Sequence, residues 1–161
     1  MREDSNLKTK FLVQAGIIAA IYAALTIMLA PFSYGPMQIR VSEALTILPY
    51  FTPAAVPGLF IGCLVSNYIS PYGVIDMICG SGATLIAAAG SYMLRSKPIL
   101  VPLPPVLANA VIIGLMLHYA YGVPMNLFLI MAWIGLGELI ACYAIGYPLL
   151  RYLKKYKGIF E

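Results

Sequence analysis

Long apolar runs, separated by short polar or proline- and glycine-containing breaks, are the main pattern along this chain. About 20 mainly apolar residues make one helical membrane span. The runs and breaks predict six helices, and these lie at about 11–30, 41–52, from the turn at Pro57 to 70, 74–94, 102–120 and 125–152. The pattern therefore predicts an all-α membrane protein, a six-transmembrane-helix bundle that forms a single domain over residues 1–161.

Composition agrees with a membrane environment. Hydrophobic residues make up 61% of the chain and charged residues 10%, and the mean hydropathy is +0.89. A soluble domain has roughly half its residues apolar and about a quarter charged. So few charges cannot cover a water-facing surface of this size, and the spans leave no room for a soluble catalytic or nucleotide-binding domain.

The basic residues predict the topology. With six spans, nine of the ten fall on one side of the membrane, namely Arg2, Lys8, Lys10, Arg95, Lys97, Arg151, Lys154, Lys155 and Lys157. Only Arg40 falls on the other side. Cytoplasmic loops carry the excess of Lys and Arg, so both termini of this multi-pass cell-membrane protein are expected in the cytoplasm. The basic tail is then a topological signal and a contact for anionic lipid, and no nucleic-acid partner is expected.

The motifs of several enzyme classes are missing from the sequence. It has no GxxxxGK[ST] loop for nucleotide phosphates, no HExxH and no GxSxG. Cys63, Cys79 and Cys142 lie within spans without ligand spacing, and His118 has no metal-ligand partner at helical spacing. We therefore expect neither an enzyme nor a cofactor, and we interpret the cysteines as small buried residues.

Polar residues inside the spans, or at their outer ends, are the candidate site. They are Gln38, Arg40, Glu43, Asn67, Asp76, Asn109, His118 and Glu138. A buried ionisable group in a bilayer costs at least ~2.5 kcal/mol on insertion scales, which makes it a functional candidate. Most of these residues belong to the outer half, whereas Asn109 and Glu138 lie deeper. This distribution predicts a cup that opens outward and has Asn109 and Glu138 as its floor.

Structural roles compete for several of these side chains. Arg40 and Glu43 are three residues apart and could form a local ion pair. Asp76 could cap the start of its helix, and Asn67 could bond a neighbouring helix. Trp133 fits either an aromatic belt or the cup. Three carboxylates against one arginine suit a ligand that is rich in N–H donors or positively charged, while proton coupling is a competing use of the same carboxylates.

The first helix carries small residues at helical spacing. Ala15, Ala19 and Ala23 follow each other at intervals of four, with Gly16, Ala20 and Ala24 one step around the helix. Such faces let two helices approach closely. We expect the Ala15, Ala19 and Ala23 face to be smooth, without polar groups, and to dock against a helix of a partner.

Four segments of the chain resemble the QueT family. They are 34–49 (YGPMQIRVSEALTILP), 57–63 (PGLFIGC), 102–110 (PLPPVLANA) and 135–139 (GLGEL). The resemblance implies a substrate-binding S component of an energy-coupling-factor (ECF) transporter for queuosine precursors such as 7-cyano- or 7-aminomethyl-7-deazaguanine. It also implies the partners, which are a transmembrane T component that receives the first helix and two cytoplasmic ATPases.

This ligand implies roles for the polar side chains. A deazaguanine presents N1–H and a 2-amino group as adjacent donors, and the carboxylate of Glu138 or Glu43 could accept both. Gln38, Arg40 or Asn109 could donate to its O6 atom.

Further roles follow for the ring and its substituent. Tyr34, Tyr72 or Trp133 could stack on the flat ring. Asp76 suits the ammonium group of the aminomethyl form, and Asn67 borders the same site.

Two other functions are compatible with the same sequence features. One is the same scaffold with another vitamin or nucleobase as ligand. The other is a stand-alone proton-coupled carrier that uses Glu138 or Asp76 as its proton site.

Overall fold

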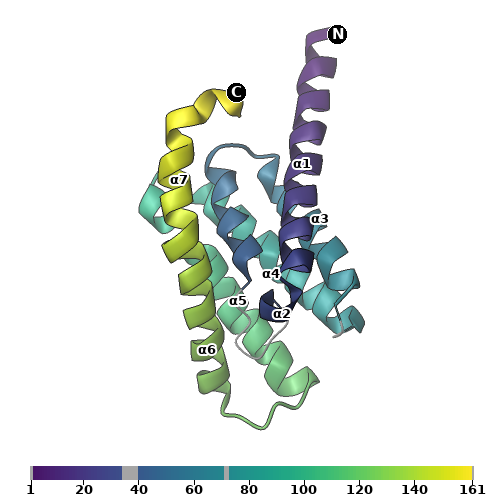
Figure 1. Ribbon diagram of the computed structural model, residues 1–161, viewed down its shortest axis with the longest axis vertical. Helices are drawn as coiled ribbons and strands as arrows, with labels where there is room; N and C mark the ends of the chain where they lie inside the picture. Colours follow the sequence, from purple (N-terminus) through teal and green to yellow (C-terminus); the bar gives the residue numbers. More distant parts are fainter. Residues whose placement is uncertain (1, 34–39, 71–72, 161) are drawn as a thin grey trace.

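The protein is described by a computed structural model that covers residues 2–33, 40–70 and 73–160, and every element in these ranges is a helix (Figure 1). The elements are α1 (Arg2–Met28), α2 (Ala30–Ser33), the 3₁₀ helix η1 (Val41–Tyr50), α3 (Ala55–Tyr68), α4 (Gly73–Met93), η2 (Pro98–Leu100), α5 (Leu103–Leu115), η3 (Met116–Ala120), α6 (Leu127–Leu139), η4 (Ile140–Gly146), α7 (Tyr147–Leu153) and η5 (Lys154–Ile159).

The six predicted segments all contain helix, but they differ in length. Four continuous helical stretches are long and apolar enough to cross a membrane, namely Asn6–Met28, Gly73–Met93, Pro98–Ala120 and Leu127–Tyr156. The segments predicted at 41–52 and up to 70 form η1, with 10 residues, and α3, with 14 residues. Both are shorter than the ~20 residues of one span. The chain is thus an all-helical multi-pass membrane protein, and the count of six spans stays a prediction.

Helix α1 begins earlier than the apolar pattern predicts, at Arg2 instead of near residue 11. The polar residues before Phe11 include no proline or glycine, so the helix continues through them. It ends at Met28, shortly before Pro31, because a proline ring clashes with the carbonyl group four residues earlier. In Figure 1, α1 extends beyond the other helices at the end where both termini lie.

Helices α1 and α3 touch backbone to backbone. A Cβ atom added at Gly58 would lie 2.8 Å from the carbonyl oxygen of Ala15, and one added at Gly62 would lie 2.8 Å from that of Ala19. Only glycine leaves room for this approach on α3, and on α1 the alanine side chains are small enough to allow it. The two helices therefore meet at two successive levels.

Helix η1 is an unusual element, because 3₁₀ runs longer than 3–4 residues are uncommon. It is packed against α1, α4 and η4, and it buries Glu43 and Thr46. With about three residues per turn, side chains three apart lie above one another. Arg40, Glu43 and Thr46 are therefore aligned along one edge that faces the interior.

The end of the molecule that carries both termini is closed by Gln14 of α1. The Thr52 hydroxyl donates to Gln14 Oε1 at 2.9 Å, and Gln14 Nε2 donates to the carbonyl oxygen of Phe160 at 3.1 Å. The ring of Phe160 stacks on Phe51, with centroids 4.8 Å apart. These contacts tie the C-terminal segment to α1 and to the turn that follows η1.

Candidate functional site

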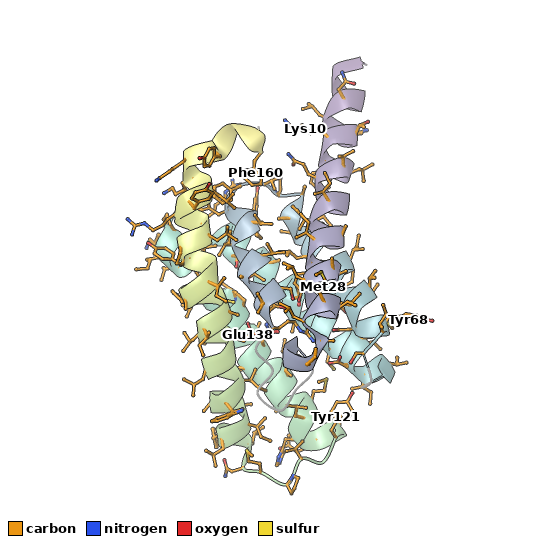
Figure 2. All side chains as sticks on the ribbon, in the orientation of Figure 1. Lys10, Met28, Tyr68, Tyr121, Glu138 and Phe160 are labelled. Carbon is orange, nitrogen blue, oxygen red and sulfur yellow. The ribbon has the colours of Figure 1, made fainter. Side chains whose placement is uncertain are left out.

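Polar side chains from five helices and from the residue before η1 meet in the middle of the bundle, where Figure 2 shows Glu138. We call them the polar centre: Arg40 before η1, Glu43 on η1, Asn67 on α3, Asp76 on α4, Asn109 on α5 and Glu138 on α6. Apart from half-buried Arg40, each exposes 5% of its surface or less. The structure thus brings together six of the predicted site residues.

The Glu43 carboxylate is held through one of its oxygens. Tyr22 on α1 donates a short hydrogen bond to Oε1, and the Thr84 hydroxyl on α4 lies 3.4 Å from the same atom. The other oxygen, Oε2, is buried and has no hydrogen-bond partner among the described residues. The carboxylate therefore has a fixed orientation and one free acceptor.

Asn109 lies between the two glutamates. Its side-chain amide is within hydrogen-bonding reach of both Glu43 and Glu138. The thiol of Cys142, one helical turn after Glu138, is 3.5 Å from Glu138 Oε2. Two carboxylates therefore lie beside one amide, and the cup with Asn109 and Glu138 as its floor stays a prediction.

Arg40 supplies the positive charge of the centre. Its guanidinium interacts electrostatically with Glu43, Asp76 and Glu138, and its Nη1 atom lies 3.6 Å from Cys63 Sγ. Three carboxylates surround this one arginine, so the centre has an excess of acceptors.

Asn67 connects the end of α3 to the start of α4. Its Nδ2 atom donates to the backbone oxygen of Asp76 at 3.2 Å and lies 3.4 Å from Cys63 Sγ. Within the described ranges, Asn67 Oδ1 and Asp76 Oδ2 are buried without hydrogen-bond partners. Asp76 lies in the first turn of α4, and its buried position at the centre fits a ligand contact as well as a role at the helix start.

Three buried oxygens of the centre therefore accept no bond from the described residues: Glu43 Oε2, Asn67 Oδ1 and Asp76 Oδ2. Leaving a buried acceptor without a donor costs about 1–3 kcal/mol. A ligand with several N–H groups would recover this cost by donating to them. The arrangement is suited to binding such a ligand.

Sequence reasoning missed two α1 residues that belong to this network. Tyr22 and Thr26 are fully buried, and Thr26 donates to the Ser42 hydroxyl on η1 at 2.7 Å. The prediction of a smooth α1 face without polar groups is therefore wrong. The available signal was spacing, because Tyr22 follows Ala15, and Thr26 follows Ala19, by seven residues on the same face.

Two of the three cysteines, Cys63 and Cys142, are buried as predicted, and both also contact polar groups. Cys63 accepts from the Thr84 hydroxyl at 3.2 Å, and Cys142 lies 3.7 Å from the Thr46 hydroxyl. Cys79 is half-buried beside an apolar cluster. Cys63 and Cys142 thus fill space directly around the carboxylates.

Other predicted residues lie apart from the centre or outside the description. Trp133 exposes 48% of its surface and lies five residues before Glu138, on a different face of α6, so its predicted place beside the ligand ring is not supported. The ring of His118 packs edge-on against Tyr119. Tyr34, Gln38 and Tyr72 lie outside the described residues.

The predicted docking face of α1 is covered within the molecule. Ala15 and Ala23 expose only 7% and 8% of their surfaces, and the Ala15 and Ala19 backbone contacts α3. This packing corrects the prediction that these alanines are free to meet a partner. The neighbouring stripe is the exposed one, and it consists of Gly16, Ala20 and Ala24.

Apolar helices, four of them long enough to cross a bilayer, surround a buried cluster of carboxylates, amides and an arginine. This combination defines a multi-pass membrane protein with a buried polar cluster in its interior. The chain belongs to the QueT transporter family, whose model matches residues 12–155 and thus the whole polar centre. It is accordingly a member of a transporter family and not of an enzyme family.

One relative has a name that indicates its substrate. A "Queuosine precursor transporter QueT" from Lactococcus lactis subsp. cremoris is 40% identical to this chain over 81 residues. The aligned part covers 49% of this chain and 47% of the relative, so the match spans about half of the relative's length. None of the solved structures matches the chain.

Proposed function

We propose that this chain is the substrate-binding S component of an energy-coupling-factor transporter. It captures a queuosine precursor, a 7-deazaguanine such as the 7-cyano or 7-aminomethyl form, from outside the cell and delivers it inward with ATPase-driven partners. Family membership and the name of the Lactococcus relative support this substrate class.

The excess of buried acceptors at the polar centre carries the proposal. The centre combines three carboxylates, three oxygens without partners and a single arginine. A 7-deazaguanine has N1–H and the 2-amino group side by side, which is the donor pattern that a carboxylate accepts with two bonds. Its aminomethyl form adds a cation, which suits the surplus of negative charge.

The contacts of each carboxylate indicate how the ligand is oriented. Tyr22 and Thr84 occupy Glu43 Oε1, so Oε2 is the atom presented to the ligand. Glu138 lies across Asn109 from Glu43 and offers the second carboxylate. Arg40 is placed to donate to O6, and Asp76 receives the ammonium group of the aminomethyl form.

The same proposal includes the six-span topology with cytoplasmic termini. Both termini lie at one end of the molecule, as an even number of crossings requires (Figure 1). Nine of the ten basic residues belong to that side in the six-span arrangement. Helices η1 and α3 provide the second and third crossings, and their short length brings the polar centre close to the outer surface.

The first test is thermal unfolding of the detergent-solubilised protein with 7-deazaguanine precursors, guanine and several vitamins. A ligand at 100 times its Kd stabilises the folded protein by about 2.7 kcal/mol, which a melting curve resolves. We expect stabilisation by a deazaguanine and none by guanine. Stabilisation only by another vitamin or nucleobase would keep the S-component scaffold and overturn the substrate.

Glu138→Gln is the matched test of the site. This variant keeps the size of the side chain but removes a charge-assisted acceptor, so it should lose at least about ten-fold in affinity for the ligand. Trp133→Phe, on the same helix but half-exposed, serves as the control and should bind normally. Normal binding by Glu138→Gln would remove Glu138 from the site.

The buried Asp76 carboxylate also favours a second function, a stand-alone proton-coupled carrier that uses Glu138 or Asp76. Transport assays separate the two functions. An S component requires the ATPases for uptake. Uptake that continues without the ATPases but stops when the proton gradient is dissipated would establish the carrier.

A further inference from the structure

A pocket lies at the end of the molecule that carries the termini, away from the polar centre. It has a volume of about 430 Å³ and is formed between η2 and the last helical segment. Its lining residues are Pro98, Ile99, Tyr147, Leu150, Arg151 and Lys154. In Figure 1, η2 lies beside α7 at this end of the bundle.

The walls of this pocket combine an apolar floor with a cationic rim. Leu150 is fully buried at the floor, and Pro98 and Ile99 line the opposite wall. Arg151 and Lys154 are exposed, and their spacing of three residues places both on the face that lines the pocket. None of the six lining residues is acidic.

The position along the last span places the pocket at the membrane surface. The helical stretch Leu127–Tyr156 carries tyrosines near its end, at positions 143, 147, 152 and 156, together with three basic residues at 151, 154 and 155. Tyrosines and basic side chains gather where a helix leaves the hydrocarbon core. Tyr143 donates a hydrogen bond to the backbone oxygen of Ile99 at 3.1 Å and fixes η2 against this helix.

We infer that this pocket binds one anionic phospholipid. Arg151 and Lys154 contact the phosphate and the acidic headgroup, and the glycerol and first acyl carbons lie on Ile99, Pro98 and Leu150. A free phosphate ion would use the cations but would leave the apolar walls without a partner. A zwitterionic lipid would add a cation beside two basic residues. The pocket therefore favours an anionic lipid such as phosphatidylglycerol over both.

The test is a binding titration of the full-length protein in detergent, followed by native mass spectrometry. The probes are phosphatidylglycerol, phosphatidylcholine with the same acyl chains, and inorganic phosphate. The double variant R151Q/K154Q is compared with K8Q/K10Q, which removes two exposed charges from α1 near the same end. At about five-fold per lost charge, R151Q/K154Q should bind phosphatidylglycerol about 25-fold more weakly. The K8Q/K10Q variant should bind it like the unmodified protein.

A third variant tests the pocket without a change of charge. Ile99→Trp adds bulk at an exposed wall position and should also weaken phosphatidylglycerol binding. If R151Q/K154Q does not fold, this variant tests whether the lipid binds in the pocket. Equal losses in the two charge variants would show diffuse attraction and overturn the inference. Equal binding of the two lipids, or complete competition by inorganic phosphate, would overturn it as well.

Discussion

At the scale of single residues, Glu43 connects several helices. Its side chain joins η1 to α1 through Tyr22 and to α4 through Thr84, and its backbone oxygen accepts from the Thr46 hydroxyl. A carboxylate that accepts a short hydrogen bond from a buried tyrosine cannot rotate freely. The free Oε2 atom therefore keeps a constant direction, which lowers the entropic cost of binding a ligand.

Tyr22→Phe tests this arrangement. The variant removes the O–H donor, and the remaining Thr84 contact of 3.4 Å is too long to replace it. We expect unfolding free energy to fall by about 1–3 kcal/mol, because a buried carboxylate loses its donor, and ligand affinity to fall with it. Thermal unfolding with and without ligand measures both effects.

The control for this prediction is Tyr119→Phe, which removes the same hydroxyl from a side chain that is 74% exposed. It should change neither stability nor affinity. If the two variants had the same small effect, Tyr22 would not support the Glu43 carboxylate.

The charged residues of the polar centre could be predicted from the sequence. Burying a charge in a bilayer costs free energy, so a charged residue inside a span is a candidate for a functional role. The hydroxyl members could not be predicted. The hydroxyls of Thr84 and Thr26 each lie within hydrogen-bonding distance of the backbone carbonyl four residues earlier, as they would in any membrane helix, so their presence gives no signal. Tyr22 looks like one more tyrosine in a chain that has 12.

At the scale of elements, the contact between α1 and α3 depends on glycines. Gly62→Ala would place a methyl group 2.8 Å from both the Ala19 oxygen and the Tyr22 Cβ, and the backbone cannot move away locally. The helices would have to separate, which we expect to cost about 1–3 kcal/mol of unfolding free energy. Chemical or thermal denaturation in detergent measures the loss.

Gly82→Ala on α4 is the matched control, since nothing lies within 4 Å of its added methyl group. Alanine is the better helix former, so this variant should be neutral or more stable by up to about 1 kcal/mol. Equal destabilisation by both variants would mean that the α1–α3 contact is not specifically tight.

The existence of the helices could be predicted from apolar runs, but their type could not. A run of about ten residues fits a 3₁₀ or an α helix equally well, and η1 is a 3₁₀ helix that packs against five neighbouring elements. The π-helical turn η4 directly after α6 has no sequence signal either. Its last residue, Gly146, lies against the Ala44 backbone of η1, so these two unusual elements are packed together.

At the scale of the whole molecule, the exposed stripe of Gly16, Ala20 and Ala24 is the small-residue face that remains for the proposed T component. Ala20→Trp should prevent assembly with the energy-coupling partners, because the bulky ring keeps two helices apart. Ligand-induced stabilisation of the isolated protein should be unchanged. Co-purification of the partners and a melting curve provide the two measurements.

Ile86→Trp on α4 is the control for assembly, because Ile86 is a similarly exposed apolar position on another helix. It should permit co-purification. Loss of the partners in this variant, or normal assembly of Ala20→Trp, would contradict docking through α1.

Which of the two small-residue stripes is exposed could not be predicted from the sequence of α1. Both have the same size and spacing, and only the glycines at 58 and 62, more than 30 residues further along the chain, cover one of them. Long-range packing of this kind is decided by the partner helix and not by the local pattern.

The close contact of α1 and α3 also has a mechanical consequence. Atoms of the two backbones already touch at the levels of Gly58 and Gly62, so no compressible layer of side chains separates the helices. A sideways push on the outer face of α1 therefore reaches Cys63 and Asn67, which follow Gly62 on α3, almost without loss. Because α1 and α3 would move together, any tilt of this chain in the bilayer would be transmitted to the polar centre.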